Sequence, residues 1–336
     1  MRVTFLGAGA FGIPTLRALH KHHDVLGVVT QPDKPAGRKR KLTPTPIAQE
    51  AEALGLTATR SADVNTPECV AQLRAWDARA AVVIAFGQKL SDEVIAAAGR
   101  DLAVNLHASL LPKYRGAAPI QRAVMEGERD TGVAVIGLAQ RMDAGPVYAS
   151  AATPVGPLET AGELHDRLAQ LGPDAVLRVL DQLDRGALSP AEQDESLATK
   201  APKLKKTDGT VSFDQPADDV RARVHGLTPW PGCRVSWFSK DLDRRELILR
   251  RVEAASPASG AVAPVIAPSN AKPGEVLPAS ADAASGAVHV ACAPGVLRLL
   301  EVQAPGSGPM PVAQFVAGKP IRPGDRFEAL SPASGP

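Results

Sequence analysis

The sequence predicts an α/β domain with a doubly wound, mostly parallel sheet, followed by a smaller β-barrel domain. Strand and helix patterns alternate from the start of the chain, and Ala80 to Phe86 (AAVVIAF) is apolar without interruption. A strand of that kind has both faces covered, as in a parallel sheet flanked by helices. Beyond residue 209, short apolar runs separated by proline and glycine replace this alternation, as in small barrels. A chain of 336 residues is long enough for both domains.

Composition narrows the class of protein further. The net charge is only +2, which argues against a surface that is basic throughout. The three cysteines, Cys69, Cys233 and Cys292, lack metal-ligand spacing, so we expect neither a disulfide framework nor a metal site. No apolar run approaches the length of a membrane span, and the amino terminus lacks a signal-peptide layout. We therefore expect a cytoplasmic protein.

The first strand, residues 2–7, leads into a glycine turn with the pattern GxGxxG, formed by Gly7, Gly9 and Gly12. Such a turn can bind the pyrophosphate of a dinucleotide, but an acidic residue should then end the second strand. The second strand, Val25 to Thr30, ends in Thr30 and Gln31. This favours a turn used for close packing of strand and helix. A nicotinamide dehydrogenase stays as an alternative, which failure to bind NAD would dismiss.

Two segments carry bunched cations without any acid among them. The first lies in the proline-rich stretch QPDKPAGRKRKLTPTPI, residues 31–47, which is long for a connection within a compact α/β unit. A phosphate backbone is one partner for such a loop, and a mobile surface insertion is the alternative. The second bunch, Lys200 to Lys206, lies in a polar stretch at 186–210 that has the composition of a linker.

The remaining elements follow from periodicity and from turn residues. We expect helices over Pro46 to Leu54, Thr66 to Trp76, Glu93 to Ala98 and 120–128, a strand over 131–139, and an amphipathic helical region over 159–183 that breaks at Gly172-Pro173. In the second domain we expect barrel strands from the apolar runs Val220 to Val224, Arg234 to Trp237, Leu247 to Val252, Val288 to Ala291 and Val296 to Val302. The Ala/Pro/Ser stretch from Ala254 to Ala271 has the composition of a disordered insertion.

The stretch NLHASLLPKYRGAAP, residues 105–119, holds the candidate chemistry. Leu102 to Val104 has the pattern of a buried strand, so Asn105 and His107 should follow its carboxyl end, where open α/β sheets bind ligands. Residues two apart on extended backbone share a face, which would direct an amide and an imidazole at one group. Asp143, after the strand at 131–139, could face this pair. The alternatives are ordinary loop polars for the pair and a surface turn for Asp143.

Several spaced motifs together resemble the bacterial methionyl-tRNA formyltransferase family. In chain order they are QPDKPAGRKRKLTPTPI, AFGQKL, NLHASLLPKYRGAAPIQRA, a TGV strand leading to MDAG, ATKAPKLKK and LTPWPG. The likeness extends from Arg2 to about Phe327. It implies a Rossmann-like formyltransferase domain at 1–189, a basic linker at 190–208 and an OB-like tRNA-binding barrel at 209–330. It also implies an enzyme that transfers formyl from 10-formyltetrahydrofolate to the amino group of methionine on initiator tRNA. Separately, we expect a monomer.

The resemblance assigns residues by position. The catalytic residues of the family fall on Asn105, His107 and Asp143. Its folate contacts fall on Ser109, Leu110, Leu111 and Pro112, and its pterin segment on Phe86, Gly87, Gln88, Lys89 and Leu90. Its tRNA contacts fall on Lys34, Arg38, Lys39, Arg40 and Lys41, with Lys203, Lys205 and Lys206 in the basic linker. The chain departs from the family at Lys200, where tyrosine is frequent, and in the apolar strand before Asp143.

The residue types suit this reaction on their own terms. An amine that attacks a formyl carbon produces a tetrahedral oxyanion, which Asn105 and a protonated His107 could stabilise as hydrogen-bond donors. Asp143 could orient His107 and relay protons. A formyltransferase for a sugar-nucleotide amine is one alternative, and the basic segments favour tRNA over it. A noncatalytic RNA-binding protein is another, and the set of Asn105, His107 and Asp143 speaks against it.

Overall fold

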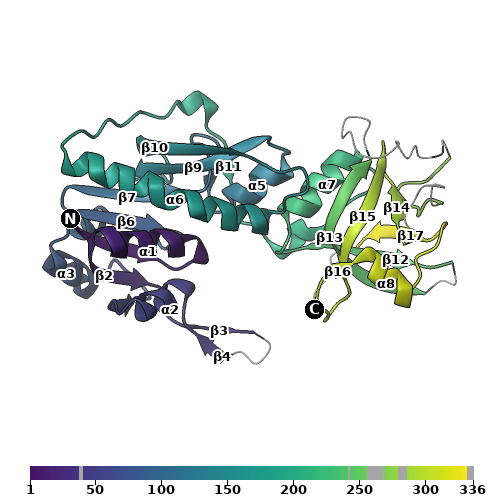
Figure 1. Ribbon diagram of the computed structural model, residues 1–336, viewed down its shortest axis with the longest axis horizontal. Helices are drawn as coiled ribbons and strands as arrows, with labels where there is room; N and C mark the ends of the chain where they lie inside the picture. The colour runs from purple at the N-terminus through teal and green to yellow at the C-terminus, as the bar shows by residue number, and fades with distance from the viewer. Residues whose placement is uncertain (38–40, 241–242, 256–267, 269, 279–285, 331–336) are drawn as a thin grey trace. The chain divides into compact units, whose positions relative to one another are not determined.

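The computed structural model describes residues 1–37, 41–240, 243–255, 268, 270–278 and 286–330 (Figure 1). The predicted site residues Arg38, Lys39 and Arg40, and most of the Ala/Pro/Ser stretch, lie outside these described residues. The chain forms two compact units. Unit 1 comprises Met1–Pro119, Asp130–Pro154 and His165–Ala201, and unit 2 comprises Ile120–Arg129, Val155–Leu164 and the described part of Pro202–Pro336. Among the described residues, no helix is long and apolar enough to cross a membrane.

Unit 1 is built on a seven-stranded sheet with the strand order β10-β9-β7-β6-β1-β2-β5. Its strands are β1 (Arg2–Gly7), β2 (Asp24–Thr30), β5 (Ala58–Arg60), β6 (Ala80–Ile84), β7 (Leu102–His107), β9 (Asp130–Gly137) and β10 (Val147–Pro154). The neighbours from β7 to β5 pair in parallel, and β9 and β10 are added antiparallel. The predicted mostly parallel sheet is therefore confirmed. The strand order reverses between β1 and β6, and this is where open α/β sheets form ligand crevices.

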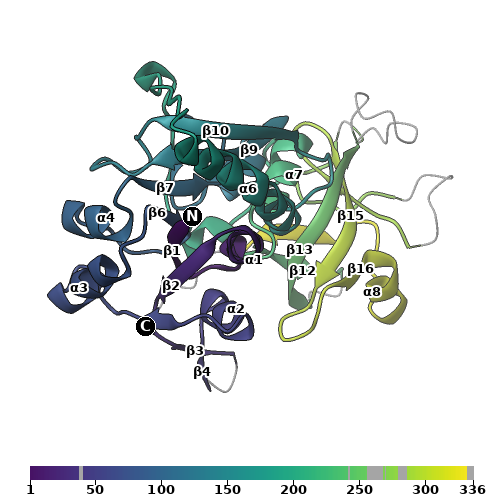
Figure 2. The same cartoon turned by 60° about the vertical axis from the view of Figure 1, so that its left-hand side comes forward.

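Helices cover this sheet (Figures 1 and 2). They are α1 (Ile13–His22), α2 (Pro46–Ala53), α3 (Pro67–Trp76), α4 (Asp92–Ala98) and most of α6 (Ala161–Asp184), with the short η1 (Ala10–Gly12). Helix α5 (Pro119–Met125) belongs to unit 2 except for Pro119. Thr45, Thr66 and Ser91 cap α2, α3 and α4 by accepting a backbone N–H from the first turn, which sets where these helices begin. The helices α3 and α4 pack on one face through a core that includes Leu73 and Val94.

The glycine turn after β1 serves close packing, in agreement with its composition. A Cβ on Gly7 would lie 2.9 Å from the carbonyl oxygen of Ile84, and one on Gly12 would lie 3.0 Å from the ring of Phe5. At the end of β2, the hydroxyl of Thr30 is buried and hydrogen-bonds to that of Thr45 at 2.6 Å. The glycine turn and the end of β2 are thus both engaged in packing within unit 1.

Two predicted features of unit 1 are wrong. Helix α6 runs unbroken through Gly172 and Pro173, where the sequence predicted a break. Gly172 lets the helix approach the sheet closely, because a Cβ there would lie 2.5 Å from Cδ2 of Leu106. Strand β7 also extends further than predicted. Asn105 and His107 therefore lie within the strand, near its carboxyl end, and do not follow it. The strands β5 and β10 were not predicted.

Unit 2 contains a six-stranded antiparallel sheet with the path β14-β15-β13-β12-β17, and β16 pairs with β15. The strands are β12 (Cys233–Phe238), β13 (Arg244–Ala255), β14 (Val288–Ala291), β15 (Val296–Gln303), β16 (Met310–Pro311) and β17 (Arg326–Ala329). Glu275 bridges to Arg326 of β17, and Val276 bridges to Val290 of β14. These bridges join the two ends of the path, so the sheet closes into the predicted small barrel.

Two helices accompany the barrel, α7 (Ala217–Gly226) and α8 (Val312–Gly318). The predicted strand at Val220 to Val224 is wrong, because these residues lie in α7. Val220, Ala222 and Val224 alternate with arginines as a strand pattern would, but all three are buried on the helix. The intervening Arg221 and Arg223 donate to backbone carbonyls of Pro157, Asp208 and Thr210.

Candidate functional site

Asn105 and His107 lie on one face of the sheet near the carboxyl end of β7. Asn105 pairs with Val83 of β6 and with Ile136 of β9, and His107 pairs with Ala134. Ala103, two residues before Asn105, packs on the core of α3 and α4. Asn105 and His107 continue this face, because side chains on a strand alternate. The opposite face, which carries Leu106, packs against α6 at Gly172.

The imidazole of His107 is only 6% exposed and has a partner on each side. Its Nε2 lies 2.9 Å from the backbone carbonyl oxygen of Tyr114. A carbonyl oxygen only accepts, so Nε2 carries the hydrogen of this bond. Its Nδ1 lies 3.7 Å from Oδ2 of Asp143. Nδ1 is therefore the ring nitrogen that faces the carboxylate.

Asp143 lies in the connection from β9 to β10, with a left-handed backbone conformation (φ 54°). Its Oδ2 accepts the backbone N–H of Gly116 at 2.8 Å, and its own backbone carbonyl accepts Nε2 of Gln193 at 2.8 Å. A residue other than glycine with this backbone needs support from its surroundings. The N–H of Gly116 supports the carboxylate of Asp143, and the amide of Gln193 supports its backbone carbonyl.

The Asn105 side chain is half-buried. Among the residues that the structure describes, its amide has no hydrogen-bond partner. A half-buried amide at the carboxyl end of a central strand is costly to leave unpaired unless water or a ligand pairs with it. Asn105 is thus free to donate to a bound group.

The predicted folate contacts comprise one fully buried residue, whose hydroxyl is hydrogen-bonded, and three half-buried residues. Ser109 is fully buried, and its hydroxyl donates to the carbonyl of Lys113 at 2.6 Å, so this side chain closes the turn. Leu110, Leu111 and Pro112 are half-buried. The apolar part of this segment can therefore contact a ligand, whereas Ser109 shapes the backbone.

The predicted pterin segment follows β6, beside the reversal in strand order. Phe86 is buried in the core with α3 and α4, and its carbonyl accepts Nε2 of Gln31 at 2.6 Å. Gln88 accepts the N–H of Val64 and donates to the carbonyl of Ser61, both at 2.8 Å. The side chains of Phe86 and Gln88 thus hold the segment in place. Its remaining members, Gly87, Lys89 and Leu90, are exposed or half-buried.

The predicted basic contacts that the structure describes are exposed. Lys34 lies on β3 (Lys34–Ala36) and Lys41 on β4 (Lys41–Thr43), two short strands that pair as an antiparallel hairpin. Lys203, Lys205 and Lys206 lie in unit 2, at and before the short helix η3 (Lys206–Gly209).

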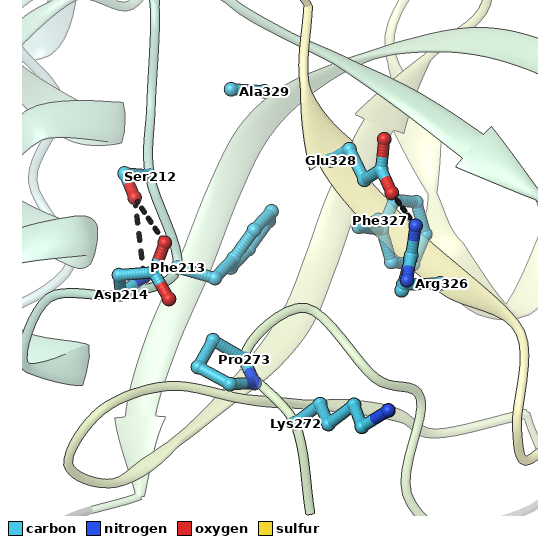
Figure 3. A pocket seen from close by; sticks show the side chains of 9 residues that line it. All are labelled: Ser212, Phe213, Asp214, Lys272, Pro273, Arg326, Phe327, Glu328 and Ala329. Atoms are coloured by element: carbon cyan, nitrogen blue, oxygen red, sulfur yellow. Dashed lines mark hydrogen bonds and ion pairs between the residues drawn. The ribbon is translucent and has the colours of Figure 1, made fainter.

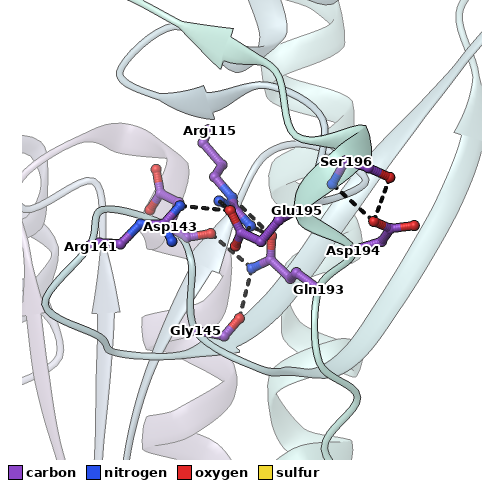
Figure 4. A network of polar contacts seen from close by, with 8 residues as sticks. All are labelled: Arg115, Arg141, Asp143, Gly145, Gln193, Asp194, Glu195 and Ser196. Atoms are coloured by element: carbon purple, nitrogen blue, oxygen red, sulfur yellow. Dashed lines mark hydrogen bonds and ion pairs between the residues drawn. The ribbon is translucent and has the colours of Figure 1, made fainter.

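A polar network beside Asp143 was not predicted (Figure 4). The guanidinium of Arg115, on β8 (Arg115–Gly116), donates to Oε1 of Gln193 and to both carboxylate oxygens of Glu195. Arg141 also donates to Glu195, at 2.6 Å. Hydrogen bonds from Arg115 and Arg141 lower the pKa of Glu195 to about 2. No sequence signal marked Gln193 or Glu195, because both lie in a stretch with the composition of a linker.

A cavity of about 260 Å³ lies in the barrel of unit 2, apart from the predicted site residues (Figure 3). Its floor is formed by Phe213 and Phe327, whose rings are 6.4 Å apart. At its rim Ser212 pairs with Asp214 and Arg326 with Glu328, whereas the side chain of Lys272 is exposed.

Comparison with known proteins gives matches along almost the whole chain. The family model for formyl transferase matches residues 1–180, and that for the formyl transferase C-terminal domain matches residues 203–320. A methionyl-tRNA formyltransferase of Akkermansia muciniphila is 36% identical over 95% of this chain and 97% of its own. One from Nitrobacter winogradskyi is 38% identical over 98% of this chain and 99% of its own.

The chain belongs to the methionyl-tRNA formyltransferase family. Solved structures with the same fold are less similar to this chain in sequence than these relatives are. An N-formyltransferase from Helicobacter canadensis, in complex with folinic acid and dTDP-3-aminofucose, has a TM-score of 0.62 at 12% identity and covers 88% of this chain and 97% of its own. HypX from Aquifex aeolicus with tetrahydrofolic acid has a TM-score of 0.58 at 18% identity over 94% of this chain. The chain spans about half the length of HypX, at 47%.

For a formyltransferase of this family, the arrangement at β7 suits acyl transfer. An unpaired amide, an imidazole and a carboxylate lie at or near the carboxyl end of one central strand, and the last two are 3.7 Å apart. Such groups can donate hydrogen bonds to an oxyanion and move a proton. The identification therefore agrees with what the side chains can do.

Proposed function

We propose that this chain transfers a formyl group from 10-formyltetrahydrofolate to the free amino group of methionyl-initiator-tRNA. The observation that carries the proposal is the identity to methionyl-tRNA formyltransferases, which extends over both units at 36% to 38%. The product, a formylated initiator tRNA, serves the start of translation. The chain would accordingly act in the cytoplasm, as a monomer, with residues 1–189, 190–208 and 209–330 as catalytic domain, linker and tRNA-binding domain.

In the proposed reaction the methionine nitrogen attacks the formyl carbon, and a tetrahedral intermediate with a negatively charged oxygen forms. The bond from this carbon to N10 of the folate then breaks. The attacking nitrogen loses a proton and N10 gains one, which leaves tetrahydrofolate. Asn105, whose amide is unpaired among the described residues, would donate to the oxygen. His107 would act through Nδ1, because Nε2 is held by Tyr114. Asp143 would accept or return the proton at that side of the ring.

The folate would lie against the ends of β6 and β7. Leu110, Leu111 and Pro112 offer half-buried apolar surface, and the backbone from Phe86 to Leu90 borders the reversal in strand order. Phe86 and Gln88 have their side chains committed to the core and to Ser61 and Val64. In this proposal the segment therefore recognises the pterin mainly through backbone groups, since those side chains are occupied.

The tRNA would contact the exposed cations of the hairpin and of the basic stretch before η3. Lys34, Lys41, Lys203, Lys205 and Lys206 are exposed, as phosphate contacts require. Arg38, Lys39 and Arg40 complete the proposed set. Cations supply affinity for the phosphate backbone without reading sequence, so the choice of initiator tRNA needs further contacts.

The direct test is to incubate the purified chain with 10-formyltetrahydrofolate and methionyl-tRNA, and to analyse the aminoacyl group by acid gel or mass spectrometry. We expect the mass of one formyl group to be added. In Asn105→Ala or His107→Ala, turnover should fall by about 10²- to 10³-fold, while folate affinity changes much less. Full activity in either variant would remove that residue from the mechanism.

A sugar-nucleotide amine serves as the competing acceptor in the same assay. Formylation of the sugar nucleotide without formylation of methionyl-tRNA would replace the proposed substrate but keep the chemistry. Neither product, under conditions where folate binds, would overturn the proposed function.

A further inference from the structure

The segment from Ala191 to Ala201, here called the strap, lies between the two stretches that the family models match. It belongs to unit 1 and contains the short helix η2 (Glu195–Leu197) and the strand β11 (Lys200–Ala201). Its hydrogen bonds to the rest of unit 1 come from Ala191, Gln193, Glu195, Thr199 and Ala201, and Lys200 pairs with Arg115 in a short parallel ladder. The strap is therefore bonded to unit 1 along most of its length.

The first half of the strap runs along the connection that carries Asp143. Ala191 and Val147 exchange backbone hydrogen bonds, both of 2.8 Å. Gln193 follows and donates from Nε2 to the carbonyls of Asp143 at 2.8 Å and of Gly145 at 2.7 Å. Glu195 then binds Arg141 at 2.6 Å. The strap thus holds this connection on both sides of Asp143 and at Asp143 itself (Figure 4).

The orientation of the Gln193 amide is fixed by chemistry. Its Oε1 accepts from Nε of Arg115 at 3.0 Å and from Nη2 at 2.7 Å. A guanidinium only donates, so the oxygen must face Arg115 and the NH₂ group must face the two carbonyls. Both hydrogens of that group have an acceptor. Gln193 is half-buried, so water competes less for these bonds than at an exposed site.

The second half of the strap holds the other partner of His107. The Oγ1 of Thr199 accepts the backbone N–H of Tyr114 at 2.8 Å, and the carbonyl of Thr199 accepts that of Arg115 at 2.9 Å. Tyr114 has a left-handed backbone (φ 62°), and its carbonyl is the group that binds Nε2 of His107. Both neighbours of the imidazole, at Nε2 and at Nδ1, are therefore anchored to the strap.

We propose that Gln193 is a positioning residue for formyl transfer, which fixes the backbone of Asp143 so that its carboxylate faces Nδ1 of His107. The inference rests on the proposed function and deepens it. Gln193 touches no reacting atom, and it acts through Asp143. Without its two donated bonds, the left-handed conformation at Asp143 loses its main-chain support, and the carboxylate can turn away from the ring. A displacement of about 1 Å at such a group can cost about 10²-fold in rate.

The test uses two variants of the full chain. Gln193→Leu keeps the approximate size and removes every hydrogen bond. Gln193→Glu keeps an oxygen toward Arg115 and replaces the donating NH₂ with an oxygen that faces two carbonyls. We expect kcat to fall by about 10- to 100-fold in both variants, with KM for folate and tRNA within about twofold of the wild type. Asp194→Asn is the matched control and should keep the wild-type kcat, because within the described part of the chain the Asp194 side chain hydrogen-bonds only to Ser196.

A double-variant cycle tells whether Gln193 acts through Asp143. In an Asp143→Asn background, adding Gln193→Leu should change kcat by less than about twofold, since residues that act as a unit are not additive. An equally large loss in both backgrounds would overturn the proposal. So would wild-type kcat in both Gln193 variants, or a loss confined to KM.

Amide hydrogen exchange at Gly116 gives a readout that needs no activity. This N–H binds Oδ2 of Asp143 at 2.8 Å, so its exchange reports whether the carboxylate stays in place. We expect faster exchange in Gln193→Leu and Gln193→Glu, with Asp194→Asn unchanged. Unchanged exchange at Gly116 in both Gln193 variants would overturn the inference. This holds even where a variant is less stable overall. The two failures can be told apart. A wild-type chain that formylates neither methionyl-tRNA nor a sugar nucleotide would count against the proposed function, whereas unchanged exchange at Gly116 would count against the role of Gln193.

Discussion

The strap and the β3–β4 hairpin are two connections of unit 1 that have similar composition but different contacts. Both are polar segments with few apolar residues, and both contain or adjoin bunched cations. The strap bonds to the connections that carry Asp143 and Tyr114. In the hairpin, the described side chains bond locally, as Lys34 does to Gln31 and Thr43 to the carbonyl of Lys41.

This difference shows that the role of a connection depends on where its polar atoms find partners. In the strap, side-chain amide, carboxylate and hydroxyl groups bond to backbone and to arginines elsewhere in unit 1. In the hairpin, Leu42 is 64% exposed, and Lys34 and Lys41 are exposed as well. The strap thus has the contacts of a support, and the hairpin exposes the side chains that the proposed tRNA contact requires.

The sharpest way to separate the two connections is to add one methyl group where the strap makes contact, at Gly116 of β8, and one within the hairpin, at Gly37. Gly116 and Gly37 both have a positive φ, of 128° and 69°. A Cβ on Gly116 would lie 2.5 Å from the carbonyl of Ala201 in the strap, whereas one on Gly37 would meet nothing within 4 Å. We expect Gly116→Ala to lower the free energy of unfolding by about 3 kcal/mol, from backbone conformation and overlap together. Gly37→Ala should cost about 1 kcal/mol, from conformation alone.

Urea unfolding followed by circular dichroism measures both values. An equal loss of unfolding free energy in the two variants would mean that the strap moves aside for the added methyl group at no cost. The distinction between a supporting and an exposed connection would then fail.

A smaller effect is expected from the charges of the hairpin. Neutralising Arg38, Lys39, Arg40 and Lys41 together should weaken tRNA binding by about 10- to 100-fold at moderate salt and flatten its salt dependence. Each phosphate contact that is lost lowers the slope of log K against log salt by roughly 0.9 or less. Filter binding at several salt concentrations measures the slope. A variant with four exposed cations of unit 1 away from the hairpin neutralised, Lys21, Arg74, Arg178 and Arg185, controls for the same change in net charge. An unchanged slope in the first variant would leave the hairpin without a role in tRNA binding.

The smallest effect concerns the exposed end of the strap. Hydrogen bonds from Arg115 and Arg141 lower the pKa of Glu195 from 4.5 to about 2. A carboxylate with a lowered pKa in the folded state contributes stability above its unfolded value, and this contribution is lost as pH falls from about 4.5 to about 2. Glu195→Gln should therefore lower the melting temperature by no more than a few degrees near neutral pH, because exposed ion pairs are weak.

Thermal melts of wild type and Glu195→Gln across this pH range are the measurement. The two melting temperatures should converge as pH approaches 2. A difference that stays constant down to that pH would show that Glu195 stabilises the strap without its charge.

Much of unit 1 could be predicted because its patterns are local. The apolar run AAVVIAF became the buried β6, and the helices predicted over Pro46 to Leu54 and Thr66 to Trp76 are formed, each after a capping threonine. Errors arose where tertiary packing overrode a local pattern. Pro173 suggests a broken helix, but Gly172 packs on Leu106 and the helix continues. Val220 and Val224 alternate with arginine as a strand would, but they lie buried on a helix.

The candidate site shows the same division. Asn105 and His107 could be found from their spacing after an apolar run, and Asp143 from its place after the strand at 131–139. Gln193 and Thr199 could not be found in this way. Their importance comes from bonds to Asp143 and Tyr114, which lie far from them in the chain, and one sequence contains no record of such pairs.

The strap is the last part of unit 1 to leave the ribosome, although it supports residues made much earlier. A nascent chain that ends before Gln193 already contains Asn105, His107 and Asp143, but it lacks the anchors of Asp143 and Tyr114. Because domains fold as units during synthesis, unit 1 can reach its final arrangement only after Ala201 has emerged. Fragments cut at residue 180, where the first family match ends, would likewise carry the proposed catalytic side chains without the segment that bonds to Asp143 and Tyr114.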